Sequence, residues 1–458
     1  MYLRSLQIDN LKLLRGFELD VCRDGEPRMW TVLVGRNGLC KTSILRAVAL
    51  AASGPARANQ LAQDLMVSLR DARRTDASLE IQAEFELPAT PDYGQLARGQ
   101  PALTRSLRSS LQLAANRQLF SGDSSFLAGA AAQSSTQQVL LNTASDASDA
   151  RDPLEDARTR KPPPRRWFVA AYGTSRSLAL PGSTAAPDDV VRTRMETLFD
   201  RGRIIGTSFA DHFDGAHART YVKVLRAAML NHAELLPNVQ TLELRGRGGV
   251  NSADQLVMSH RFDTAAGTGS LRLPATWLSH GYQATIAWLA DLVGHILWEA
   301  SESNSSIDID PADMQGLVLI DELDLHLHPS WQVGLIPALK QTFPKLQFIV
   351  TTHSPMLLAG LEGDEIVMLD QDPSTGDITK RSDPRPAKLM TGTELLKRYF
   401  EIDRLYPVNL SKEMFQYGRL ASDPERTDAE EVEVQRIYRE LQQAGVAPDW
   451  APIPRRVG

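Results

Sequence analysis

One segment constrains the fold more than any other, because it joins a buried strand, a glycine-containing loop and a helix in immediate succession. The apolar run MWTVLVG (29–35) is typical of a buried strand that ends in glycine. The loop GRNGLCKT follows, and TSILRAVALAAS (42–53) then has helical spacing, with an expected stop at Gly54–Pro55. Backbone N–H groups at such a helix start form an anion-binding nest. The segment predicts a phosphate-binding loop.

The loop also predicts how a nucleotide would be held. Lys41 would bring a positive charge to the β and γ phosphates, and the Thr42 hydroxyl would bind Mg²⁺. Cys40 stands where glycine usually precedes the lysine, so it is either an innocuous small residue or a thiol-sensitive position with reduced turnover. The residues expected to bind the phosphates are Gly35, Arg36, Asn37, Gly38, Leu39, Cys40, Lys41, Thr42 and Ser43.

Two further apolar runs indicate strands that are buried on both faces of a parallel sheet. GLVLID (316–321) ends in the acidic pair Asp321–Glu322, and LQFIVTT (346–352) ends just before His353. Ligands of parallel sheets bind at the carboxyl ends of strands, so these side chains should lie beside the phosphate loop. We expect Asp321 to hold Mg²⁺, and Glu322 to orient or deprotonate the attacking water. His353 is expected to hydrogen-bond a γ-phosphate oxygen or that water.

Two other polar features precede helices. Ser279 is placed to cap the long helix that follows LSHGYQ, where the positive helix end would attract an anion, although an ordinary cap is the alternative. His326 and His328 have a spacing that can bind zinc, but no third ligand is evident.

Composition narrows the class of protein. The 458 residues carry a net charge of −6, so no global positive field attracts nucleic acid, and two cysteines fit a reducing cytoplasm. The start of the chain has no secretory signal, and IAWLADLVGHILW (286–298) is interrupted by Asp291 and His295, which favours a buried helix over a membrane span. A cytoplasmic protein with no membrane contact is predicted.

Five segments are expected. They are 1–88 as the N-terminal half of the nucleotide-binding head, 89–165 as a low-complexity insertion that is partly helical, 166–270 as a helical and hairpin lobe, 271–380 as the C-terminal half of the head, and 381–458 as a helical tail. Within the tail, residues 427–445 predict a helix with a capping box from Asp428 to Glu431 and a stop at Gly445.

The motifs G-x-N-G-x-x-K-T, L-S-H-G-Y-Q, apolar-D-E and T-T-H-S-P, in this order, resemble the Walker A, signature, Walker B and switch-histidine motifs of ABC-type ATPases. The chain is similar to the soluble RecF, SMC-head and OLD-like branch, and DELDLHLHPSWQ with FIVTTHSP resembles stand-alone anti-phage defence ATPases such as the Septu-type ATPase. The resemblance covers 1–88 and about 166–370. It implies an α/β head with a mainly parallel central sheet, an N-terminal antiparallel β-subdomain, a helical signature lobe and a helical C-terminal tail.

The resemblance further implies ATP and Mg²⁺ as cofactors and ATP hydrolysis as the activity. Ser279, His280 and Gly281 would cap the γ-phosphate of an ATP bound by a second protomer, and Asp324 to His328 would cross between the protomers. The active form would be a head-to-tail homodimer or a higher homo-oligomer. Tyr172–Gly173 and Arg176 would lie near the loop that couples the nucleotide to the helical lobe.

The relatives differ in the effectors that they carry, and the sequence shows no nuclease cluster, so an effector protein such as a nuclease is the expected partner. DNA or RNA contacts are expected from the basic stretch Lys161, Arg165 and Arg166 and from the turn Arg245–Gly249. A non-hydrolysing ATP-dependent switch, a DNA repair or recombination ATPase and a transporter subunit are the alternatives, the last disfavoured by the insertion and tail.

Overall fold

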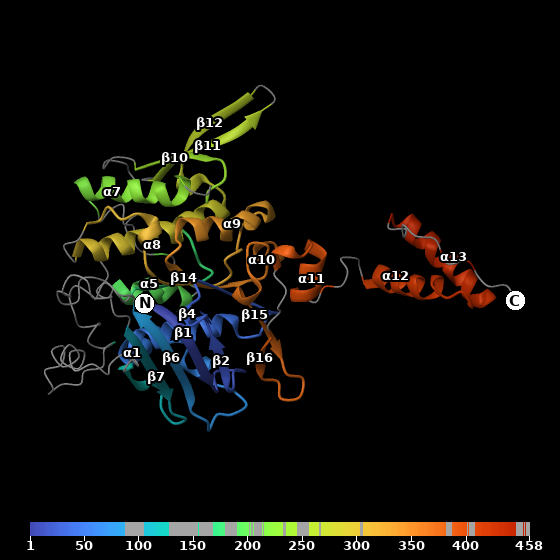
Figure 1. The fold of residues 1–458 in the computed structure, drawn as a ribbon, viewed down its shortest axis with the longest axis horizontal. Coiled ribbons are helices and arrows are strands. Elements are labelled where there is room, and N and C mark those ends of the chain that lie inside the picture. Colours follow the sequence, from blue (N-terminus) through green and yellow to red (C-terminus); the bar gives the residue numbers. More distant parts are fainter. Residues whose placement is uncertain are drawn as a thin grey trace. The chain divides into compact units, whose positions relative to one another are not determined.

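The chain divides into a large unit, Met1–Met390, and a small unit, Thr391–Gly458, which are drawn together in Figure 1. The computed structural model describes 1–87, 105–127, 168–178, 190–200, 215–231, 235–244, 256–264, 267–302, 306–381, 387–400 and 408–445, and the single positions 154, 202, 205, 213, 402, 452 and 454.

A six-stranded sheet forms the centre of the large unit. Its strand order is β16-β15-β5-β14-β13-β9, and every pair is parallel except β15 with β16. All residues of β5, β9, β13 and β14 are buried, which is why their sequences are continuous apolar runs. The bounds are β5 Trp30–Val34, β9 Val169–Tyr172, β13 Gly316–Ile320, β14 Leu346–Thr352, β15 Ile366–Gln371 and β16 Ile378–Arg381.

A second, antiparallel sheet has the order β2-β1-β6-β7-β8. Helix α1 contacts strands of both sheets, and its apolar residues belong to one core with theirs. The predicted α/β class, with a mainly parallel central sheet and an N-terminal antiparallel β-subdomain, is thereby confirmed. The bounds are β1 Tyr2–Asp9, β2 Phe17–Asp20, β6 Leu79–Leu87, β7 Arg105–Leu113, β8 Ser121–Leu127 and α1 Lys41–Leu61, with the small pieces β3 Cys22–Arg23, β4 Glu26–Pro27 and α2 Met66–Leu69.

This region contains one strand pair that was not predicted and one helix break that was. The described part of the expected insertion, 105–127, is a strand pair that extends the antiparallel sheet, because Leu107, Leu111 and Leu113 share one buried face at strand spacing. Leu154 is buried, and the rest of 89–165 lies outside the described residues. The predicted stop at Gly54–Pro55 is confirmed as a break within α1, because Gly54 has the non-helical angles φ 74° and ψ 163° and two helical segments meet there at a kink.

Helices α5, α7, α8, α9 and α10 and a three-stranded sheet, β10-β11-β12, complete the large unit (Figure 1). The hairpin of β10 and β11 was expected and β12 was not; its turn, including Arg245–Gly249, lies outside the described residues, as do Lys161, Arg165 and Arg166. The bounds are α5 Val190–Phe199, α7 Gly215–Arg226, β10 Val239–Leu244, β11 Leu256–Thr264, β12 Gly267–Pro274, α8 His280–Glu302, α9 Pro329–Thr342 and α10 Pro355–Leu358. Short turns of other helix types are η1 Ala227–Asn231, η3 Ala275–Trp277, η4 Pro311–Asp313, η5 Gly363–Glu365 and η6 Ala387–Leu389.

The predicted buried helix at 286–298 is confirmed within α8. Asp291 accepts a hydrogen bond of 2.9 Å from the Tyr172 hydroxyl and lies 3.5 Å from His295, so the two polar residues of this run lie together inside the fold. Across the parts of the chain that the structure describes, no helix combines the length and the apolar character that crossing a membrane would need.

The small unit contains α11 Gly392–Phe400, α12 Val408–Ala421 and α13 Asp428–Gln443. Helices α12 and α13 share their own apolar cluster, which includes Tyr417 and Ile437. The capping box of α13 is Thr427 with Glu430, one residue earlier than predicted, because the Thr427 side chain reaches the Glu430 N–H and Glu430 reaches back. The predicted stop is confirmed by Gly445, which has φ 73° just after the helix. The five-segment division stays a prediction.

Candidate nucleotide-binding site

The loop between β5 and α1 is folded around the Lys41 ammonium. Nζ donates hydrogen bonds to the carbonyl oxygens of Gly35 at 2.7 Å and Arg36 at 2.9 Å, and the residue is 7% exposed. Burial lowers the pKa of Lys41, while the nearby carboxylates of Asp321, Glu322 and Asp324 raise it. The carbonyl oxygens of the loop therefore accept the Lys41 N–H bonds that phosphate oxygens would otherwise accept. The ammonium group is also attracted by the carboxylates that follow β13. Of the other expected loop residues, Leu39 and Ser43 are buried and Arg36, Asn37 and Gly38 are exposed.

Two residues of the loop have left-handed backbone conformations. Gly38 has φ 87°, and Cys40 has φ 58° and ψ 18° at the cap of α1. A left-handed conformation costs an L-residue on the order of 1–2 kcal/mol, which is the physical reason that glycine suits the position before the lysine. Cys40 therefore keeps the loop geometry at the expense of local strain, and its half-buried thiol packs against the core of the large unit.

Replacing Cys40 tests this interpretation. Cys40→Gly is expected to be more stable to unfolding than Cys40→Ala by about 1 kcal/mol, because alanine keeps the strained Cβ and glycine removes it. Chemical denaturation followed by circular dichroism measures the difference. Equal stability of the two variants would show that the strain is negligible. Cys40→Ala, which deletes only the thiol, separates strain from any effect of the sulfur on ATP binding.

Asp321 joins the phosphate loop to the sheet. It follows β13 directly and is 6% exposed, and its Oδ2 accepts a hydrogen bond of 2.8 Å from the Thr42 hydroxyl. Its Oδ1 accepts one of 2.7 Å from the Thr351 hydroxyl at the end of β14. The Thr42 hydroxyl at the start of α1 and the Asp321 carboxylate at the end of β13 are thus adjacent. Such oxygen atoms would suit Mg²⁺, with phosphate oxygens and water as the remaining ligands. Thr42 and Asp321, the predicted metal ligands, are together, as the parallel sheet required.

Glu322 is half-buried and has φ 49°, a left-handed conformation that is rare for residues other than glycine. Its N–H donates to the Thr351 hydroxyl at 2.7 Å. The strand β13 ends at Ile320, and the left-handed residue Glu322 begins the turn that follows it. Left-handed residues of this kind cluster at functional sites, and Cys40 and His326 are further examples in this structure.

The tip of β14 carries the predicted switch histidine. The His353 N–H donates to Asp324 Oδ1 at 3.2 Å, and the Thr352 hydroxyl donates to the same oxygen at 2.6 Å. Burial, with help from the Lys41 charge, lowers the pKa of the His353 imidazole, and the carboxylates of Asp324, Glu322 and Asp321 oppose this. A lowered pKa leaves the ring neutral at pH 7, as a hydrogen-bonding role requires. The catalytic assignments of Glu322 and His353 stay predictions.

The two histidines of the H-x-H pair have different environments. His328 caps α9, with its Nδ1 accepting from the Ser330 N–H at 3.3 Å. His326 has φ 65° and is exposed, and its ring lies 5.9 Å from that of His280. Within the described parts of the chain, no three or more His, Cys, Asp or Glu residues are grouped to hold a metal ion.

The signature segment begins α8 and faces outward. Ser279 and His280 are exposed, and the Ser279 carbonyl accepts the first helical hydrogen bond, from the Gln283 N–H at 3.0 Å, which places Ser279 at the predicted cap position. Gly281 is buried, and a Cβ on it would lie 2.5 Å from the His326 carbonyl oxygen. Glycine is therefore needed at 281 so that α8 can pack against the turn after β13.

Three residues near the carboxylates were not assigned roles from the sequence. Thr351 and Thr352 hold Asp321 and Asp324, and the guanidinium of Arg176 contacts the carbonyl oxygens of Asp321 and Glu322. The threonines at the end of the run LQFIVTT were the available signal, since they follow a strand expected beside that of Asp321. Arg176 was placed only near a coupling loop.

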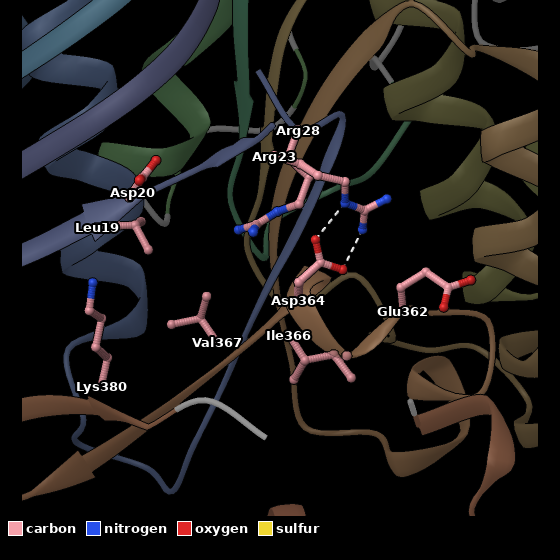
Figure 2. A pocket seen from close by; sticks show the side chains of 10 residues that line it. Leu19, Asp20, Arg23, Arg28, Glu362, Asp364, Ile366, Val367 and Lys380 are labelled. Atoms are coloured by element: carbon pink, nitrogen blue, oxygen red, sulfur yellow. Dashed lines mark hydrogen bonds and ion pairs between the residues drawn. The ribbon is translucent and has the colours of Figure 1, made fainter. Parts of the chain in front are cut away.

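A separate cavity of about 630 Å³ lies away from this site (Figure 2). It is lined by residues at the beginnings of strands, including Arg28 before β5 and Ile366 at the start of β15, whereas the phosphate loop follows the end of β5. Figure 2 shows Arg23 forming two bonds to Asp364 across it. Because the strands are parallel, the cavity is at the opposite edge of the sheet from Lys41 and Asp321.

The phosphate loop follows β5, and the acidic pair follows β13, which is separated from β5 in the sheet by β14 alone. This arrangement defines the class of P-loop nucleotide-binding proteins. The family described as "AAA domain, putative AbiEii toxin, Type IV TA system" matches residues 30–359. That range contains all four predicted motifs and most of the chain, and the chain belongs to this family.

Parts of the chain resemble several defence-system proteins, by their names. The Septu protein PtuA of Bacillus mycoides is 32% identical over 165 residues, which are 36% of this chain and 22% of that protein. The Retron Ec83 probable ATPase of Escherichia coli is 39% identical over 107 residues, 23% of this chain and 19% of that protein. The Retron Vc95 probable ATPase of Vibrio cholerae is 38% identical over 94 residues, 20% of this chain and 17% of that protein. The matches span about a fifth of these relatives. The predicted resemblance to ATPases of the Septu type is confirmed.

Among solved structures, the SMC head domain from Thermotoga maritima aligns with a TM-score of 0.38 and 13% identity, over 84% of this chain and 100% of that chain. The SMC head bound to the C-terminal winged-helix domain of ScpA aligns with a TM-score of 0.39 and 15% identity, over 83% of this chain and 98% of that chain.

Proposed function

We propose that the chain binds ATP with Mg²⁺ and hydrolyses it, that two copies form a head-to-tail dimer around two ATP molecules, and that this cycle regulates a nucleic-acid-targeting partner, a nuclease, in anti-phage defence in the cytoplasm. The observation that carries the proposal is the 2.8 Å hydrogen bond between the Thr42 hydroxyl and Asp321. It brings the phosphate loop and the strand-end carboxylate into one place, with the Lys41 ammonium beside them.

Each residue has a separate part in the proposed chemistry. Lys41 exchanges its bonds with the Gly35 and Arg36 carbonyls for bonds with phosphate oxygens. Thr42 and Asp321 hold Mg²⁺, which neutralises charge on the phosphates. Glu322 orients the attacking water and accepts its proton, and His353 donates a hydrogen bond to the γ-phosphate or to that water. Hydrogen bonds from Thr351 at the end of β14 hold the Asp321 carboxylate and the Glu322 N–H beside the phosphate loop.

The proposal of a dimer rests on the exposure of Ser279 and His280 at the positive end of α8. An anion bound there would come from a second protomer, as the resemblance to ABC-type ATPases implies. The defence role is supported by the names of the Septu and retron relatives, and a partner nuclease would supply the chemistry on nucleic acid. Cys40, which stands where glycine usually precedes the lysine, motivates one alternative, an ATP-dependent switch without hydrolysis. A DNA repair or recombination ATPase is the other alternative.

The proposal is tested with purified wild-type protein and Ser279→Arg. Wild type is expected to release phosphate from ATP and to form an ATP-dependent dimer in light scattering. Ser279→Arg should bind ATP within about threefold of wild type but fail to dimerise, because a bulky cation would block the closed interface without touching the phosphate loop of its own chain. Ser306→Arg is the matched control, since Ser306 is exposed beyond the other end of α8.

The outcomes separate the parts of the proposal. A wild type that binds ATP and dimerises but releases no phosphate, with or without DNA, would establish the switch instead. A Ser279→Arg variant that still dimerises with ATP would contradict the head-to-tail arrangement. A steep fall of DNA binding with rising salt is expected if nucleic acid is contacted through its phosphates.

A further inference from the structure

Arg176 is a buried cation placed directly behind the acidic pair. It lies in the loop that follows β9, is 6% exposed, and does not belong to any of the four motifs. Its Nη2 donates to the main-chain carbonyl oxygen of Asp321 at 3.2 Å and to that of Glu322. One guanidinium group thus contacts the main chain of both residues whose side chains would hold Mg²⁺ and the attacking water.

The loop that carries Arg176 is built against α5. The Gly173 N–H donates to the Thr197 hydroxyl at 3.2 Å, and that hydroxyl donates to the Ala171 carbonyl oxygen at 3.2 Å. A Cβ at Gly173 would lie 2.0 Å from the Thr197 carbonyl oxygen, so only glycine permits this approach. A tight turn follows, in which the Arg176 N–H donates to the Thr174 carbonyl oxygen at 3.0 Å. These contacts therefore fix the position of the Arg176 backbone.

The charge of Arg176 suits its position. The guanidinium group is positively charged at pH 7, and the carboxylates of Asp321, Asp324 and Glu322 are near enough to attract that charge. A buried cation is costly unless it is paired, and these carbonyl oxygens and carboxylates provide the compensation. Its Nε has no hydrogen-bond partner among the described residues, so not every N–H donor of the guanidinium group is used.

The main chain at Glu322 needs such support. Its left-handed conformation costs on the order of 1–2 kcal/mol, and a conformation of this kind persists only where neighbours hold it. Thr351 holds the Glu322 N–H, and Arg176 holds the Glu322 carbonyl, so the peptide groups on both sides of the residue are fixed. The same strand, β9, is bonded to the signature helix through Tyr172 and Asp291.

We propose that Arg176 is a positioning residue that holds the main chain of Asp321 and Glu322 so that their carboxylates face Mg²⁺ and the attacking water. This inference rests on the proposed ATP-binding and hydrolysis function. Arg176 acts through the two acids and does not itself touch the nucleotide. Loss of its guanidinium should therefore affect metal-dependent binding and turnover, and should leave the metal-independent affinity for ATP nearly unchanged.

The test compares Arg176→Gln, Arg176→Lys and the control Arg28→Gln. Arg28 is also a buried arginine bonded to a main-chain carbonyl oxygen, that of Trp30 at 3.0 Å, but it lines the cavity of Figure 2 at the opposite sheet edge. Four quantities are measured for each protein: the thermal midpoint, kcat and KM for phosphate release, and the ATP affinity, which is measured with Mg²⁺ and with EDTA.

We expect Arg176→Gln to lower kcat at least about tenfold with KM within about threefold, and to reduce the gain in ATP affinity from Mg²⁺ at least about threefold. Arg176→Lys should restore part of both, because a single ammonium can still bind one carbonyl. Arg28→Gln should lose thermal stability and keep kcat and the gain from Mg²⁺.

A loss of thermal stability alone in Arg176→Gln, with kcat and the Mg²⁺ gain as in wild type, would overturn the proposal and leave a structural residue. If Arg176→Gln does not fold, the Arg176→Lys variant decides by the same two quantities. If wild type releases no phosphate, hydrolysis as a function fails, but the Mg²⁺ comparison still supports or overturns the role of Arg176.

Discussion

Glu322→Gln is expected to reduce phosphate release at least about 100-fold, which corresponds to about 2.7 kcal/mol, and to change ATP affinity less than about threefold. Glutamine has the size of glutamate and can keep the same neighbours, but it cannot accept a proton. The Glu322 N–H bond to Thr351 and the Arg176 contact involve only the main chain, so they are unaffected by the change. Steady-state phosphate release and equilibrium binding of a fluorescent ATP analogue measure the two effects.

The control for this variant is Glu362→Gln, at a half-exposed carboxylate beside the cavity of Figure 2. It should retain wild-type turnover.

Because hydrolysis is blocked after ATP has bound, Glu322→Gln should also accumulate as the ATP-bound dimer, which light scattering would detect. Turnover within about threefold of wild type would show that another group, with His353 the first candidate, activates the water.

Lys41→Ala is expected to weaken ATP binding about 10–100-fold, because one or two charge-assisted hydrogen bonds to phosphate are lost at roughly 1.5–3 kcal/mol each. The ATP-induced rise in thermal midpoint should fall in parallel, since a ligand stabilises the folded state in proportion to its binding. Isothermal titration calorimetry measures the affinity, and a thermal scan at fixed ATP measures the rise.

Lys340→Ala provides the matched control for Lys41. Lys340 is likewise partly buried and bonded to a main-chain carbonyl oxygen, that of Gly360 at 3.2 Å, and it pairs with Glu365 at 2.6 Å. It lies on α9, outside the phosphate loop, so ATP affinity should be unchanged. Wild-type affinity in Lys41→Ala would exclude the loop as the phosphate site, whatever the hydrolysis rate.

Much of the site could be predicted because it is made from strand ends. Strands buried on both faces have continuous apolar sequences, and β5, β13 and β14 were recognisable for this reason. Parallel strands in one sheet end at the same edge, so Lys41, Asp321 and His353 were expected together. By contrast, β7 and β8 were missed, because three leucines spaced along a polar segment give a weak signal for a strand.

The sequence by itself determined the phosphate loop, the strands that carry the acidic and histidine tips, and the glycine-terminated last helix, because each depends on local spacing and conformational preference. Only the tertiary structure decided that Arg176 supports Asp321 and Glu322, that Thr351 joins them to β14, and that Gly281 meets the His326 carbonyl. These contacts link residues far apart in the chain. They depend on the register of β9, β13 and β14 and on left-handed turns at Glu322 and His326, which the surrounding structure imposes on residues whose own preference is different.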